Sequence, residues 1–434
     1  MQIIEVVAFG GPEVLRPREV AEPEPGPGQA LVAVEVADVL TLDAALRRGD
    51  GRGWFDLAPP YVPGGGIAGR VVAVGADSDA GWVGRRVVAS LGQSGAAAEL
   101  AVAPVDALVE VPDGLSSADA AALVRDGLTA AGLLEAAAVR AGERVLVTAA
   151  AGAMGVLLVQ QLLAAGAVVV GAVRGRAKRS VVGGSGAHVV DYDDPGWTDA
   201  AAELAGGPFD VVLEGAGGEV GRAAFAVTAD GGRFSAHGAP SGDFAPIGDG
   251  EAAARGIALR GIRDLWFAPD DVRRLTAGAL ERAAAGAIRP AIVRALPLAR
   301  AADAHRAIDE RRTAGKTVLV VDRPAGLRAS VAVAAEVLSW EGTDATWGVR
   351  GEHSLRVGGK ELGHLHGDRV AHFGFPRDVG AALRAEGRVG PHPVNPHSTG
   401  LAARAIRTEE DVRDVIALMR LNFDRVTRAP AAAR

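Results

Sequence analysis

The stretch TAAAGAMGVLLVQQ, residues 148–161, joins an apolar strand, RVLVTAA, to an apolar helix that continues as LLAAG. Gly152 permits a tight turn and Gly155 opens the helix, with Ala153 and Met154 between them. Free N–H groups at the positive end of a helix dipole suit a pyrophosphate. The stretch therefore predicts a dinucleotide-binding turn, although two glycines at this spacing also fit a turn chosen only for helix–strand packing.

The residues after the next apolar strand decide which dinucleotide is expected. A site for NAD usually places a carboxylate there, about 20 residues after the glycine turn, to bind the ribose 2′-hydroxyl. Here the strand VVVGAV is followed by a basic run that includes Arg174 and Lys178. Cations favour a 2′-phosphate, so we predict NADPH over NADH. The alternative is a solvated basic start of a helix.

The pattern of the chain predicts an α/β protein with an additional C-terminal α+β domain. Residues 1–122 are rich in Gly, Pro and Val, which is typical of a β-rich module. Residues 123–256 alternate β-branched strands with Ala-rich helices and predict a doubly wound parallel sheet. Residues 257–322 are expected to add helices at 270–285 and 299–312 and a final strand, KTVLVVD (316–322). A linker is expected at 323–329, before the last domain at 330–434, whose tail is expected to fray.

Composition excludes several classes of protein. The chain contains no Cys, so it can form neither disulfides nor thiolate zinc sites. Its net charge of −7 gives no general attraction to nucleic acid or to an anionic membrane. Apolar runs are too short to span a bilayer, and the N-terminus does not read as a signal peptide. We therefore expect a cytoplasmic protein that acts on a small molecule.

Six stretches, taken in order, resemble the zinc-independent quinone oxidoreductase branch of the medium-chain dehydrogenase/reductase superfamily. They are PPYVPGGGIAGRVVAVG (59–75), DGLTAAGLLEAAAVRAGERVLVTAAAGAMG (126–155), GAHVVDY (186–192), DVVLEGAGG (210–218), GGRFSAHG (231–238) and AHRAIDERRTAGKTVLVVD (304–322). The resemblance implies a GroES-like domain formed by 1–122 and 257–322, a Rossmann domain at 123–256, and a homodimer.

The resemblance also implies roles for single residues. Lys178 and Tyr192 are expected to contact the 2′-phosphate end of NADPH, although Tyr192 also fits a core position at a strand end. Thr129 and the His237-Gly238 turn are expected near the nicotinamide.

The sequence departs from the superfamily pattern at the catalytic zinc positions and in the expected substrate pocket. The zinc enzymes of the superfamily carry ligands where this chain has Leu40 and Gly65-Gly66, so we expect no catalytic zinc and assign no metal ligand. Leu40 also replaces the family Asn and predicts an apolar pocket, whereas Asp43 keeps its family position as a catalytic candidate or as a residue that holds the loop. Candidate pocket walls, for which core packing is the alternative, are Trp54, Tyr61 and Trp266.

Without a metal or an evident nucleophile, the nicotinamide must perform the difficult step. We therefore expect hydride transfer to an α,β-unsaturated carbonyl or a quinone, with Asp43 and Thr129 as the catalytic candidates and no identified proton donor. Two alternatives stay open: a catalytically silent NADPH-binding regulatory protein, and an enoyl reductase specific to one biosynthetic pathway.

The last hundred residues resemble a luciferase-like family of uncharacterised function. The resemblance rests on LGHLHGD (362–368), HFGFPRDVGAALRAEGRVGPHPV (372–394) and EEDVRDVIALMRLNFDR (409–425). His-x-His on a strand would place two imidazoles on one face, as a metal site requires. An anion site and a structural or docking role are the alternatives, and the last is our working expectation. Five histidines gather here: His364, His366, His372, His392 and His397.

Overall fold

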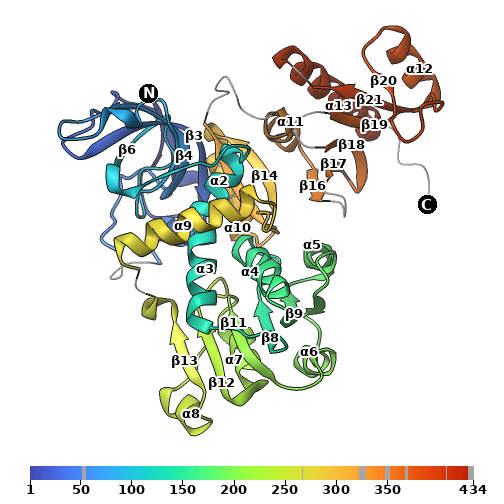
Figure 1. Cartoon of the computed structure of the whole chain (residues 1–434). Coiled ribbons are helices and arrows are strands. Elements are labelled where there is room, and N and C mark those ends of the chain that lie inside the picture. The colour runs from blue at the N-terminus through green and yellow to red at the C-terminus, as the bar shows by residue number, and fades with distance from the viewer. Residues whose placement is uncertain are drawn as a thin grey trace.

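The computed structural model describes residues 1–50, 55–265, 267–321, 329–347, 352–366, 370–406 and 408–428 of the chain. Figure 1 shows a β-rich N-terminal domain, a dinucleotide-binding domain below it, and a C-terminal domain to one side. The predicted fold class is confirmed. Trp54, Trp266 and residues 323–328 of the expected linker lie outside the described residues. No described helix combines the length and apolar character that crossing a bilayer requires.

The N-terminal domain is built on a sheet with the described order β14-β15-β3-β4-β5-β7, to which β6 adds by pairing with β3. Strand β3 is buried along most of its length, which explains its apolar sequence QALVAVEVADV. Strands β14 and β15 come from the far end of the reductase region and complete the sheet beside β3. The elements are β1 (Gln2–Val6), β2 (Leu15–Glu19), β3 (Gln29–Val39), α1 (Thr41–Arg48), β4 (Gly66–Val74), β5 (Arg86–Ser90), β6 (Leu100–Pro104), β7 (Leu108–Glu110), α9 (Pro269–Ala284), β14 (Ile292–Pro297), α10 (Ala301–Asp309) and β15 (Lys316–Val320).

The dinucleotide-binding domain holds a parallel sheet whose described order is β10-β9-β8-β11-β12-β13. The chain order reverses between β8 and β11, and in such sheets a ligand binds at that point, beyond the carboxyl ends of the strands. Its elements are α2 (Ser117–Val124), α3 (Asp126–Ala137), β8 (Arg144–Thr148), α4 (Ala153–Ala164), β9 (Val168–Val173), α5 (Arg179–Gly183), β10 (His188–Asp191), α6 (Trp197–Ala205), β11 (Phe209–Glu214), α7 (Gly218–Ala226), β12 (Thr228–Ala236), α8 (Asp249–Ala254) and β13 (Ala258–Gly261).

Two elements, α2 and β13, lie across or beyond the domain limits expected at 122 and 256. The sheet extends past residue 256, because β13 pairs in parallel with β12. Helix α2 runs across the boundary expected at 122, since it packs against β3 and β4 while its apolar residues join one core with α3, β8 and α4. The two domains therefore share a hydrophobic core where they meet.

The C-terminal domain has a hydrophobic core of its own, drawn from residues 329–426. An antiparallel sheet, with described order β16-β17-β18-β19-β21-β20, lies against α11 and α13. Helix α11 also packs on β14, and the guanidinium of Arg300 donates to the Ser339 carbonyl. The elements are α11 (Ala329–Leu338), β16 (Thr343–Trp347), β17 (His353–Val357), β18 (Lys360–His366), β19 (Val370–Gly374), α12 (Arg377–Ala385), β20 (Gly390–Pro391), β21 (Leu401–Ala405) and α13 (Glu409–Arg428).

Candidate functional site

The glycine turn lies at the carboxyl end of β8 and leads into α4. Gly152 is the N-cap and has no capping side chain, so the N–H groups of Ala153, Met154 and Gly155 in the first turn have no partner within the helix. A Cβ on Gly155 would lie 2.5 Å from the Ala149 carbonyl oxygen. Only glycine therefore lets the helix start pack this closely on the turn, and the open N–H groups suit an anion.

Two side chains that the sequence did not single out join the strands at the point where the order reverses. The Thr148 hydroxyl donates to Glu214 at 3.0 Å, and the Gly215 amide donates to the same hydroxyl at 2.9 Å. The amides of Ala216 and Gly217 donate to the Glu214 carboxylate, both at 2.7 Å. This network ties β8 to β11 and fixes the floor of the candidate cofactor site.

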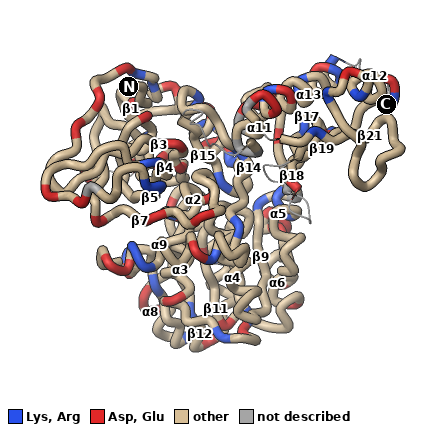
Figure 2. The backbone as a smooth tube through the Cα atoms, turned by 45° about the horizontal axis from the view of Figure 1, so that its top comes forward, with Lys and Arg blue, Asp and Glu red and all other residues tan. Residues whose placement is uncertain are grey.

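Three cations gather beyond β9, β10 and α10, at the position expected for the 2′-phosphate. The Lys178 ammonium donates to the Arg311 carbonyl at 3.1 Å. Burial, followed by repulsion from Arg174 and Arg311, lowers the pKa of Lys178. Arg174 itself lies 3.5 Å from the Asp193 carboxylate. In Figure 2 basic residues mark this region beside α5. Positive side chains therefore cluster where the 2′-phosphate is expected, an arrangement that suits an anion.

Tyr192 belongs to the same group. Its phenol is half-buried, and burial raises its pKa to about 12. Arg174 and Arg311 act on that pKa in the opposite direction, which places both guanidinium groups near the ring. Arg311 was missed by sequence reasoning because it lies outside the glycine motif and far along the chain. In the structure its φ is 54°, a left-handed conformation in the turn after α10.

The His237-Gly238 turn lies at the carboxyl end of β12, against the turn that follows β11. A Cβ on Gly238 would come within 2.1 Å of the Gly215 carbonyl oxygen, so the two turns are in close backbone contact. His237 is 8% exposed, and burial lowers its pKa to about 4. The imidazole is therefore neutral at pH 7 and forms part of the wall at the strand ends.

Asp43 is buried and holds the loop before α1. One carboxylate oxygen accepts from the Leu40 amide at 2.7 Å, and the other lies 3.7 Å from the Arg125 guanidinium. Burial raises the pKa of Asp43 to about 6, against the opposing effect of Arg125. These contacts favour the loop-holding interpretation of Asp43. Leu40 is half-buried at the N-cap of α1.

A buried cluster of charged side chains, which the sequence did not predict, lies next to Asp43. The Lys316 ammonium is 2.7 Å from the Asp126 carboxylate and 3.3 Å from that of Asp38. Burial alone would lower the pKa of Lys316, but the two carboxylates outweigh it and hold the pKa above its usual value. Asp126 begins α3, which carries Thr129 one turn later, half-buried. The group therefore fixes α3 against β3 and β15.

The positions that hold zinc ligands in related dehydrogenases do not fit a metal here. Leu40 carries no ligand atom, and a Cβ on Gly65 would lie 1.8 Å from the Gly92 carbonyl oxygen. A Cβ on Gly66 would lie 2.7 Å from the Asp38 carboxylate. The backbone is thus packed too closely for ligand side chains at either glycine.

Tyr61 packs inside the N-terminal domain. It is 8% exposed and belongs to the apolar cluster formed by β1, β3, β4 and β15. Burial raises its pKa to about 12, and its hydroxyl has no hydrogen-bond partner among the described residues. Core packing is therefore the better interpretation of Tyr61 than a pocket wall.

Comparisons with known proteins place this geometry in a family. Residues 26–113 match the alcohol dehydrogenase GroES-like domain, residues 185–319 the zinc-binding dehydrogenase model, and residues 359–422 the Luciferase domain. A quinone oxidoreductase of Pseudomonas aeruginosa is 32% identical over 73% of this chain and 98% of its own. A 2-haloacrylate reductase of a Burkholderia species is 30% identical over 72% of this chain and 96% of its own.

A mycobacterial protein solved in complex with NADPH superimposes with a TM-score of 0.67. It is 31% identical to this chain, and the match covers 74% of this chain and 100% of the mycobacterial chain. The chain belongs to the quinone oxidoreductase family of the medium-chain dehydrogenase/reductase superfamily, with a Luciferase-type domain added after it.

Proposed function

We propose that the protein is a zinc-independent, NADPH-dependent reductase of α,β-unsaturated carbonyl compounds or quinones. The observation that carries the proposal is the cationic group of Arg174, Lys178 and Arg311, in a place where an NAD site holds a carboxylate. Relatives named quinone oxidoreductase and 2-haloacrylate reductase, and a similar structure solved with NADPH, support it.

The chain's own groups bind and orient the cofactor in this proposal. The first turn of α4 holds the pyrophosphate through its open N–H groups, and the three cations with Tyr192 hold the 2′-phosphate. When bound, the cofactor supplies the hydride. The turn at His237-Gly238 and the side chain of Thr129 border the nicotinamide end.

The substrate side is apolar and relies on position rather than on a metal. Leu40 replaces the family's amide, so the substrate carbonyl receives no hydrogen bond from that position. Hydride addition leaves an enolate or a hydroquinone anion that must take up a proton. No side chain is assigned as proton donor, and water or the ribose of a bound cofactor would supply the proton. The glycine packing at 65 and 66 supports a reaction without zinc.

The test is NADPH oxidation by the untagged full chain with a panel of enones and quinones, before and after treatment with a chelator. We expect turnover with at least one substrate class and no loss of turnover after chelation. Loss of activity on chelation, restored by zinc, would contradict zinc independence. NADPH binding without turnover on the panel would favour the catalytically silent regulator, an alternative that Leu40 makes worth testing, or an enoyl reductase whose substrate is attached to a carrier.

Self-association is a separate expectation. The resemblance implies a homodimer formed through the dinucleotide-binding domain, and β13 ends the described sheet with β12 as its partner. Sedimentation of the full chain should give twice the monomer mass; a monomer at all concentrations would contradict it.

A further inference from the structure

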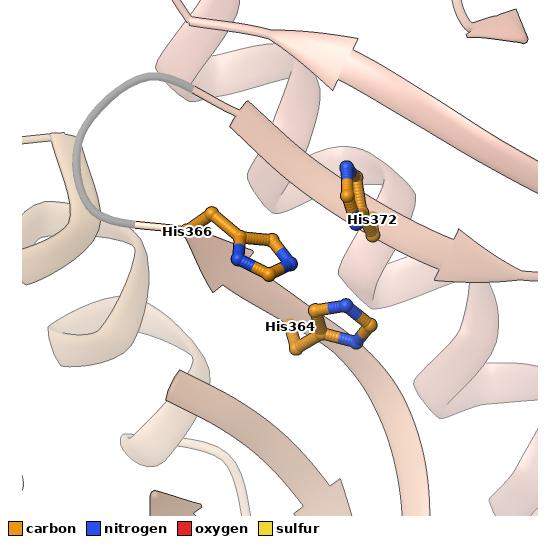
Figure 3. A group of neighbouring side chains, drawn as sticks. All are labelled: His364, His366 and His372. Carbon is orange, nitrogen blue, oxygen red and sulfur yellow. The ribbon is translucent and has the colours of Figure 1, made fainter. Parts of the chain in front are cut away.

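Three histidines from two neighbouring strands converge on one face of the C-terminal sheet. His364 and His366 are two residues apart on β18, and His364 is the cross-strand partner of His372 on β19. Figure 3 shows the three rings turned toward a common point. One ring nitrogen from each can be chosen so that all lie within 4.8 Å of one another. Nitrogens bound to one tetrahedral zinc ion are about 3.3 Å apart, given Zn–N bonds of about 2.0–2.1 Å. Small side-chain rotations close the difference.

A carboxylate already orients one of these rings. Glu361 accepts a hydrogen bond from His364 Nδ1 at 2.8 Å, and the Ser354 hydroxyl donates to the other Glu361 oxygen at 2.7 Å. A ring that donates a hydrogen bond from Nδ1–H to a carboxylate presents the lone pair of Nε2, as metal-binding histidines do.

His372 lies at the centre of the group without another role. It is 6% exposed, and its Nε2 atom has no hydrogen-bond partner among the described residues. Buried polar nitrogens are normally paired, so an orphaned one calls for an explanation. The unpaired Nε2 atom is therefore available as a ligand to an ion held between the three rings.

A fourth histidine, His392, borders the group, but one of its ring nitrogens already accepts a hydrogen bond. The His392 ring centroid lies 4.4 Å from that of His372. Its Nδ1 accepts from the Val394 amide at 3.2 Å, so in the neutral ring Nε2 carries the proton. His392 can thus donate a hydrogen bond to a ligand on the metal rather than bind the metal itself.

We propose that His364, His366 and His372 bind one divalent transition-metal ion, with Zn²⁺ as the reference metal, and that water or a small anion takes an open fourth position beside His392. Imidazole nitrogens suit Zn²⁺, Ni²⁺, Cu²⁺ or Fe²⁺, whereas Mg²⁺ and Ca²⁺ require oxygen ligands. Three neutral ligands leave the full charge on the ion, so it would polarise the bound water. The inference does not depend on the reductase proposal and departs from the structural role expected from the sequence.

The test is a zinc titration of the untagged, chelator-stripped full chain, with calorimetry in excess Mg²⁺ and Ca²⁺ and elemental analysis after dialysis. We expect one zinc per chain. Co²⁺ should give the visible absorption of a tetrahedral site with nitrogen ligands. No saturable zinc binding, or several weak ions per chain without the cobalt spectrum, would overturn the proposal.

Single substitutions test which residues bind the zinc ion. His364→Ala and His372→Ala should remove the saturable site, whereas His397→Ala, which changes an exposed histidine of the same domain, should leave it intact. Glu361→Gln should weaken zinc affinity by about 10–100-fold, as the loss of an orienting carboxylate does in other metal sites. Its matched control is Glu386→Gln, at an exposed glutamate of the same domain. Circular dichroism checks folding, and His366→Ala, at a half-buried position, serves if His372→Ala does not fold. Zinc binding unchanged in His364→Ala and His366→Ala would contradict the assignment.

Discussion

The dinucleotide-binding sheet and the C-terminal sheet each carry a candidate binding site, and they build it in different ways. In the first, parallel strands end at one edge, where glycine turns expose backbone N–H groups and cations gather beyond them. In the second, antiparallel register places side chains of β18 and β19 on a common face. The first arrangement suits a large anion, and the second suits a single cation.

The two sites also rest on different cores. The cofactor region lies over clusters that residues 36–320 form, whereas the histidines lie on the sheet that covers a cluster drawn from residues 329–426. Damage to one site should therefore spare the other. Each prediction below tests this independence or the chemistry of one site.

Gly155→Ala should have the largest effect. The added Cβ would meet the Ala149 carbonyl oxygen at 2.5 Å and Ala150 Cα at 2.7 Å, so the start of α4 must move away from the turn. We expect NADPH binding to be lost in fluorescence titrations while zinc binding at the histidines is kept.

Gly183→Ala is the matched control, because a Cβ at that glycine on α5 meets nothing within 4 Å. It should bind NADPH like the parent chain. If Gly155→Ala binds NADPH normally, the close packing of the turn is not needed for the site.

Replacing Arg174 and Lys178 together by Ala should weaken the binding of NADPH strongly and the binding of NADH only slightly. Hydrogen bonds to a charged group are worth about 1.5–3 kcal/mol each, so the two losses correspond to at least about a 100-fold change. Dissociation constants for both cofactors measure the effect. Arg16→Ala, at an exposed arginine on β2, serves as the control. An equal loss for NADH would show that the cations do not contact the 2′-phosphate.

Asp43→Asn should change how stability depends on pH. The folded pKa of about 6 lies above the ordinary 3.8, so between these values the folded state keeps a proton that the unfolded chain has released. Protonated Asp43 therefore stabilises the folded state fully below about pH 4, and this contribution is lost as the pH rises through about 6. Asn keeps an acceptor for the Leu40 amide and should flatten this part of the profile.

Denaturant midpoints across that pH window provide the measurement for Asp43→Asn. Asp106→Asn, at an exposed aspartate, should keep the parent profile. An unchanged slope in Asp43→Asn would mean that Asp43 is ionised throughout the window.

Removal of residues 322–434 should have the smallest effect on the cofactor site. The C-terminal core is separate, but α11 packs on β14 and Arg300 bonds to the Ser339 carbonyl, so truncation uncovers part of β14. We expect a folded reductase region with unchanged NADPH affinity and two melting transitions in the full chain. A truncated chain that aggregates or fails to bind NADPH would show that the C-terminal domain supports the site.

Local motifs could be predicted from the sequence, and contacts between distant residues could not. Gly152 and Gly155 are contiguous with their strand and helix, and Arg174 and Lys178 follow the next strand, so order alone indicated a cofactor site. Arg311 meets Lys178 from 133 residues away, and Glu214 meets Thr148 across two strands. No spacing rule indicates such pairs.

The histidine face shows the same limit. His-x-His predicted two rings on one face of a strand, and β18 has them there. Whether His372 lies opposite His364 depends on the register of β18 and β19, which the packing under both strands decides. Strand β13 shows the same limit, because its pairing with β12, past the expected boundary at 256, is not indicated by local composition.

The central claim is that this chain binds the phosphorylated dinucleotide, and its most direct test is a comparison of the dissociation constants of NADPH and NADH for the untagged full chain at one salt concentration. The cationic group predicts that NADPH binds at least about tenfold more tightly, the value of one charged hydrogen bond of about 1.5 kcal/mol. Equal affinities, or tighter binding of NADH, would contradict the account.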